Sequence, residues 1–188
     1  HTSALDRYSL NFNTRLFQNL MWNVLASYTE SGYEEYDAAT DTIEESDEQE
    51  DYELFTDLRY QTDDWLVKSF FQYKEHQSDE YEYAPKVLDE TDKNTSINTG
   101  VSADYKFDLG KTEARIGAEY IHRAADFKTK HGYHYRNDYA VYASFSRRFF
   151  ERLRFDVGMR QQFIDSEDGT EDHAEFVPDF GTVFTIND

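Results

Sequence analysis

The sequence has no cysteine, two prolines and eight glycines among its 188 residues. Without cysteine the chain has no disulfide framework and no cysteine-ligated zinc or iron–sulfur site. So few prolines and glycines exclude a collagen-like chain and a proline-rich linker. No uninterrupted apolar run approaches the roughly 20 residues that a membrane-spanning helix needs. The chain is therefore neither a disulfide scaffold nor a helical membrane protein.

Positive charge is also scarce. The sequence has 19 lysines and arginines against 39 aspartates and glutamates, a formal net charge of −20. Because this balance repels phosphate backbones, we do not expect nucleic acid as a partner. Aromatic residues make up 17% of the chain, whereas disordered chains contain few of them, so we expect a folded protein. The length fits one domain, 1–188.

Apolar and polar residues alternate with a period of two. In the first such segment, Tyr8, Leu10 and Phe12 alternate with Ser9 and Asn11. The pattern recurs in nine segments, at 7–16, 20–28, 52–60, 65–73, 97–107, 114–120, 139–145, 153–159 and 176–185. Such alternation is typical of strands with one apolar face and one polar face. We predict an all-β protein of about nine antiparallel strands.

The connections between these segments alternate between short and long. Short ones fall at 17–19, 61–64, 108–111 and 149–152, and long polar ones at 31–50, 78–94, 128–134 and 165–175. In an up-and-down sheet, tight turns then gather on one rim and long loops on the other. Outer-membrane β-barrels have this asymmetry, with short periplasmic turns and long extracellular loops. We therefore predict a segment of a transmembrane β-barrel.

Aromatic residues on the apolar face gather near both ends of the strands. Aliphatic residues such as Val24, Val101 and Val141 lie between them. Two aromatic belts around an aliphatic band suit the outside of a membrane barrel, because amphipathic rings prefer the headgroup depth. The belt near the short turns contains Trp22, Tyr60, Trp65, Tyr105, Phe107 and Phe155, and the belt near the long loops contains Tyr8, Tyr28, Tyr52, Tyr73, Tyr120, Tyr139 and Phe163.

A soluble β-sandwich that packs its apolar face inward is the alternative. Three features favour the barrel over it. The strands are 9–11 residues or longer, as a tilted membrane crossing requires, whereas globular strands are usually about 5–6 residues. Loop length is sorted by rim, and the apolar face is banded. The opposite face carries charges such as Lys68, Asp104, Arg115 and Arg160, which a wet interior would solvate.

Two C-terminal segments carry recurrent motifs. The segment 153–160, Leu-Arg-Phe-Asp-Val-Gly-Met-Arg, ends in Gly-apolar-Arg, and the segment 176–188 has the pattern Phe-x-Pro-x-x-Gly and closes on Asn-Asp. Both segments are similar to frequent strands in the barrel of TonB-dependent outer-membrane receptors, so this part of the chain resembles that family. An odd count of nine strands, and no visible plug domain, make us expect a middle section of a larger barrel.

The resemblance implies a function in the outer membrane. It implies energised uptake of a scarce nutrient, such as a ferric siderophore, haem or cobalamin. The implied partners are outer-membrane lipid, a TonB-type energy-coupling protein that binds outside this segment, and a small-molecule or metal-chelate ligand. A small complete porin-like barrel is the first alternative and a soluble binding domain the second. We expect neither an enzyme nor a resident cofactor, since no catalytic motif stands out.

Candidate ligand-binding residues lie in the predicted long loops. Aromatic rings there can stack on a ligand, and a histidine pair at i and i+3 can contact a metal or haem. These candidates are Tyr33, Tyr36, Tyr81, Tyr83, His131 and His134.

The loop at 31–50 is strongly acidic. Residues 34–53 contain eleven carboxylates and no lysine or arginine. Carboxylate oxygens are the ligands that Ca²⁺ prefers, but a solvated loop held open by self-repulsion gives the same composition. The candidate metal ligands are Asp41, Glu44, Glu45, Asp47, Glu48 and Glu50.

Overall fold

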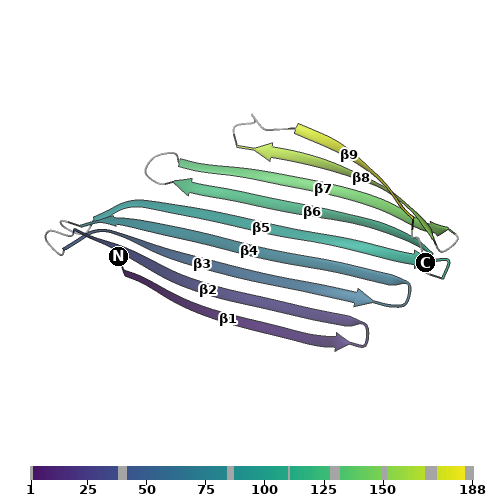
Figure 1. Cartoon of the computed structure of the whole chain (residues 1–188), viewed down its shortest axis with the longest axis horizontal. Coiled ribbons are helices and arrows are strands. Elements are labelled where there is room, and N and C mark those ends of the chain that lie inside the picture. Colours follow the sequence, from purple (N-terminus) through teal and green to yellow (C-terminus); the bar gives the residue numbers. More distant parts are fainter. Residues whose placement is uncertain are drawn as a thin grey trace.

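A computed structural model of the chain contains one antiparallel β-sheet (Figure 1). The structure describes residues 2–37, 42–83, 87–109, 111–127, 132–149, 152–167 and 173–184. Nine strands in these residues pair strictly in chain order. They are β1 (Thr2–Phe17), β2 (Leu20–Asp37), β3 (Thr42–Gln61), β4 (Trp65–Glu82), β5 (Val87–Phe107), β6 (Thr112–Phe127), β7 (Gly132–Phe149), β8 (Leu153–Ser166) and β9 (His173–Phe184).

This arrangement confirms the predicted all-β, up-and-down sheet. The short connections after β1, β3, β5 and β7 lie at one end of the sheet, which we call the turn rim, on the right in Figure 1. The connections after β2, β4, β6 and β8 lie at the other end, the hairpin rim. The start of β1 is at the hairpin rim and the end of β9 is at the turn rim. Within the described residues, β1 pairs with β2 alone and β9 with β8 alone.

The prediction of long loops at the hairpin rim was wrong in its extent. Strand β2 continues to Asp37 and β3 begins at Thr42, so most of 31–50 is paired hairpin. Strands β4 and β5 take up most of 78–94 in the same way. A tilted bilayer crossing takes about 9–11 residues, whereas β5 has 21. About half of β5 therefore extends beyond a bilayer as continuous sheet.

The sheet is inside out compared with a soluble protein. Leu10, Val101, Ile116 and Val141 on the apolar face are 50–63% exposed. The buried hydrophobic residues of the described chain are Ala140 and Ile164, whereas Asp104 and Asp138 are among the buried polar ones. An apolar face of this size does not remain in water, because soluble proteins avoid large contiguous apolar patches.

The apolar face carries the two predicted aromatic belts. Near the hairpin rim the rings of Tyr8 and Tyr28 have centroids 6.3 Å apart, and those of Tyr28 and Tyr52 are 4.8 Å apart. Near the turn rim the rings of Trp65 and Tyr105 are 4.5 Å apart. Each belt is thus a row of rings in contact across neighbouring strands. None of the described residues forms a helix that is able to cross a membrane.

Candidate functional site on the concave face

The polar face of the sheet is concave. Residues from strands as far apart as β1 and β8 line one trough of about 760 Å³ on it, which the sheet can enclose only by curving. Successive side chains of a strand point to opposite faces, so the register that sends Leu10 and Leu54 outward sends Arg7 and Asp51 into the trough. We call this cavity the trough.

Basic groups are concentrated in the trough. Arg7, Lys74, Arg123 and Arg136 line it. The acidic residues among its lining are Asp51, Glu53, Glu75 and Glu167. Glu75 alternates onto the convex face together with Tyr73, so the concave side of the trough holds four positive charges against three negative ones, although the whole chain carries −20.

A buried aspartate holds two of these arginines. Asp138 is 7% exposed and accepts a hydrogen bond from Arg123 Nη1 at 2.6 Å and another from Arg136 Nε at 2.9 Å. A guanidinium has five donors, and each arginine uses one of them on Asp138. The side chain of Arg123 is 54% exposed and that of Arg136 is 37% exposed. The pair can bind a carboxylate, phosphate or other anionic oxygen group while the protein holds it in place.

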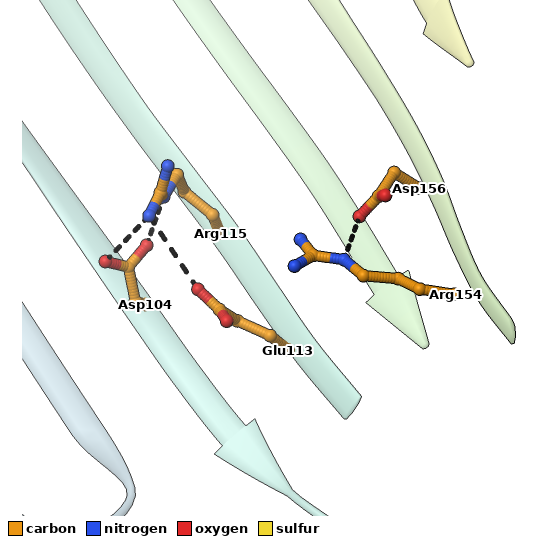
Figure 2. Close-up of polar contacts among 5 residues, drawn as sticks. All are labelled: Asp104, Glu113, Arg115, Arg154 and Asp156. Carbon is orange, nitrogen blue, oxygen red and sulfur yellow. Dashed lines mark hydrogen bonds and ion pairs between the residues drawn. The ribbon is translucent and has the colours of Figure 1, made fainter. Parts of the chain in front are cut away.

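A second polar cluster lies near the turn rim (Figure 2). Arg115 on β6 forms a two-pronged contact with Asp104 on β5 through Nε and Nη2, and its Nη2 lies 3.7 Å from Glu113. On β8, Arg154 Nε donates to Asp156 at 2.8 Å. Farther toward the hairpin rim, Arg160 pairs with Glu119 at 2.9 Å. These pairs place opposite charges side by side on the concave face, as suits a surface that faces water.

The hairpin rim brings together carboxylates from two strands. Glu80, Asp89 and Glu90 each place a ligand atom within 4.8 Å of the others. A register shift between Glu80 and Tyr81 causes this, because it leaves Asp89 without a direct partner. A hydrogen bond with Glu45, together with partial burial and the nearby charges of Asp89 and Glu90, raises the pKa of the Glu80 carboxyl above its usual value. This trio is the acidic group best placed to hold a hard cation in the described chain.

The trio was not among the residues predicted from sequence. Glu80 and the pair 89–90 lie on the two strands of one hairpin, and the register shift that joins them leaves no pattern in the sequence. The acidic composition of 79–92 was the available signal.

The predicted metal ligands are not brought together as one set. Glu45 and Asp47 lie on the concave face of β3, while Glu48 and Glu50 alternate onto the convex face. Asp47 accepts hydrogen bonds from Ser78 at 2.7 Å and from Gln49 at 2.6 Å. Glu44 lies in β3, and Asp41 lies outside the described residues.

The predicted aromatic and histidine ligands are also dispersed. Tyr33 faces the concave side of β2, where burial and the charges of Glu35 and Glu45 raise its pKa. Tyr36 donates to Glu34 at 2.7 Å, and Tyr83 contacts Ser46 at 3.3 Å. Tyr81 pairs with Ser46 in the β3–β4 register. His134 lines the trough, with Nδ1 3.5 Å from Glu167 Oε2, and His131 lies outside the described residues.

Comparisons with known proteins match the fold. No protein-family model matches the sequence, and no curated protein is similar to it. Solved structures do match. FpvA of P. aeruginosa, crystallised with a heterologous ferric pyoverdine, aligns with 99% of this chain and 34% of its own, at 16% identity and a TM-score of 0.66. FauA, the alcaligin outer-membrane receptor of Bordetella pertussis, aligns over the same shares, at 15% identity and a TM-score of 0.69.

The RagAB peptide importer is a third match. It aligns with 97% of this chain and 30% of its own, at 12% identity and a TM-score of 0.71. The chain thus spans about a third of the length of the transport proteins it matches. FpvA and FauA are TonB-dependent receptors, so this chain has the fold of a section of their outer-membrane barrel.

Proposed function

We propose that this chain is part of the barrel wall and projecting hairpins of a TonB-dependent outer-membrane receptor. The receptor takes up a scarce nutrient, such as a ferric siderophore, haem or cobalamin. The observation that carries the proposal is the pairing of an exposed apolar convex face with a charged concave trough, in a sheet that aligns along nearly its whole length with such receptors.

The convex face supports the membrane placement. Its aliphatic band lies between two rows of contacting aromatic rings, as a bilayer core between two headgroup layers requires. Lipid is therefore the partner of this face. The hairpin rim, where strands continue past the bilayer, is the extracellular side, and the turn rim is periplasmic.

The trough supports ligand capture. Arg123 and Arg136 place two guanidinium groups on the trough wall, where Asp138 holds both, and this arrangement suits an anionic chelate or carboxylate-bearing ligand. Energy for uptake would come from a TonB-type protein that contacts other parts of the receptor. This chain supplies barrel wall and binding surface, and it serves transport rather than catalysis.

The test uses the full natural polypeptide in a strain that lacks the native gene. Labelled ferric siderophores, haem, cobalamin and oligopeptides are supplied one at a time. We expect saturable uptake of one class that stops when the TonB-type protein is deleted. Arg123→Gln/Arg136→Gln should reduce this uptake about tenfold, since hydrogen bonds to charged groups are strong. Lys106→Gln, a concave-face change outside the trough, is the matched control.

Two outcomes contradict the proposal. Uptake that continues without the TonB-type protein and does not saturate identifies a passive porin. A polypeptide that stays monodisperse without detergent is a soluble β domain.

A further inference from the structure

A second cavity lies on the concave face at the turn rim, at the right-hand ends of β1 to β3 in Figure 1. Its volume is about 540 Å³, which is the size of a small-molecule site. Among the described residues it shares no lining residue with the trough. A backbone hydrogen bond of 2.9 Å from Gln61 N to Asn19 O holds the turn after β1 against the end of β3. We call this cavity the turn-rim pocket.

Two arginines line the turn-rim pocket on either side of an uncharged residue. Met21 on β2 is the direct register partner of both Arg15 on β1 and Arg59 on β3. Arg59 is in turn the direct partner of Lys68 on β4. Three cations therefore lie along one line across four strands. Like charges that lie directly opposite each other, as Arg59 and Lys68 do, destabilise a sheet.

The protein does not neutralise these three cations. Their side chains have neither a hydrogen bond nor an ion pair with another residue in the described part of the chain. Asp57 lies on the same face of β3, but its carboxylate accepts from Asn23, whose Nδ2 is 3.0 Å from both oxygens. Asp63 is the one acidic residue in the described lining, so the pocket holds two positive charges against one negative. An anion from outside the protein would therefore be stabilised here.

The other groups of the turn-rim pocket are neutral hydrogen-bond donors. The side chains of Gln18, Asn19 and Gln61 line it together with the two arginines. The planar guanidinium of arginine matches the geometry of carboxylate and phosphate groups. Because neighbouring strands lie about 4.8 Å apart, the Cα atoms of Arg15 and Arg59 are separated by on the order of 10 Å. This separation suits a ligand with more than one anionic group.

We propose that the turn-rim pocket binds a small polyanion, a ligand with two or more carboxylate or phosphate groups, through Arg15 and Arg59. The pocket lies closer to the turn rim than the trough does, so an anionic nutrient that leaves the trough for the periplasm meets it next. It then serves as a second binding site along the transport path. This role rests on the transport function proposed above, whereas the binding itself does not.

The first test measures binding to the full natural polypeptide in detergent by isothermal titration calorimetry. The probes are tricarballylate, which has three carboxylates, pyrophosphate, and acetate as a single carboxylate. All titrations use the Arg123→Gln/Arg136→Gln background, so that the trough arginines do not contribute. We expect tricarballylate or pyrophosphate to bind at least about tenfold more tightly than acetate. Adding Arg15→Gln/Arg59→Gln should weaken that binding at least about tenfold, since hydrogen bonds to charged groups are strong.

A matched control separates the pocket from general positive charge. Lys106→Gln/Arg148→Gln removes two cations from the same face on β5 and β7, outside the pocket, and should leave binding unchanged. The proposal is overturned if this control weakens binding as much, or if neither polyanion binds. An acidic segment of the same polypeptide that already fills the pocket gives the second of these results.

The second test concerns the transport path and uses the nutrient that the wild type takes up. Arg15→Gln/Arg59→Gln should lower the maximal uptake rate about fivefold. The same variant should leave binding of the nutrient to cells that lack the TonB-type protein unchanged, whereas the trough variant should reduce it. A wild-type uptake rate in the pocket variant overturns the role in transport. Absence of energised uptake in the wild type overturns the proposed function, and the calorimetry still decides whether the pocket binds polyanions.

Discussion

The ring of Tyr142 on β7 lies across Gly117, its direct partner on β6, and leaves no room there for a Cβ atom. Phe70 on β4 covers Gly100 on β5 in the same way, with a ring carbon 2.7 Å from where that Cβ would lie. Both pairs are on the concave face. Aromatic rings that cover strand glycines restore the packing that glycine lacks and help to fix register.

We predict that Gly117→Ala destabilises the sheet by about 1–3 kcal/mol, because the methyl group displaces the Tyr142 ring from a packed position. Urea unfolding of the full polypeptide in detergent measures the change. Gly158→Ala is the control, since the nearest atom to its Cβ would lie at an ordinary 3.6 Å. Tyr142→Ala should remove most of the cost of Gly117→Ala. A cost that is unchanged in that background contradicts this account.

Neighbouring residues on β5 test which face meets lipid. Val101→Arg places a charge in the aliphatic band and should cost about 2–4 kcal/mol or prevent membrane assembly. Ser102→Arg places the same side chain on the concave face and should be tolerated. Folded yield in the membrane fraction compares the two. If both variants assemble equally well, the convex face does not contact lipid.

The Arg115–Asp104 and Arg154–Asp156 ion pairs in Figure 2 should differ in energy. Asp104 is 3% exposed, so Arg115→Ala leaves a buried carboxylate without its partner and should cost about 3 kcal/mol. Arg154 and Asp156 have side chains 48% and 30% exposed, so Arg154→Ala should cost at most about 1 kcal/mol. Denaturant midpoints with a common slope measure both changes. Equal costs would show that burial of Asp104 is not the deciding factor.

The raised pKa of Glu80 predicts how the β4–β5 hairpin responds to pH. A carboxyl whose folded pKa lies above its unfolded pKa binds more protons when folded, so its contribution to stability is full below the unfolded pKa and is lost as pH rises through the folded pKa. Hydrogen-exchange protection of this hairpin should therefore fall between acidic and neutral pH. Glu80→Gln should weaken that dependence, and Glu82→Gln, two residues along the strand, should not.

The alternation in the sequence was enough to predict strand number, strand order and both aromatic belts, because lipid on one side and water on the other impose opposite requirements on successive residues. It failed at 31–50. Beyond the bilayer both faces meet water, so Asp47 and Glu48 can be equally polar while belonging to the same strand. A strand without alternation has the composition of a loop, so composition predicts a loop there.

The candidate site was less predictable for a different reason. The contacts that define it join residues on neighbouring strands, such as Asp138 with Arg123, and depend on register. The bulge that gathers Glu80 with Asp89 depends on a register shift, which local composition does not specify.

The continuation of β2 to β5 beyond the bilayer changes how a molecule arriving from outside is met. A flexible loop of about twenty residues loses conformational entropy when it binds a ligand, and this costs about 1–2 kcal/mol of free energy for each residue that becomes ordered. Here the residues lose that entropy when the sheet folds, so binding does not have to order them. A ligand arriving from outside therefore meets paired strands that are already ordered, rather than a flexible loop that must become ordered on binding.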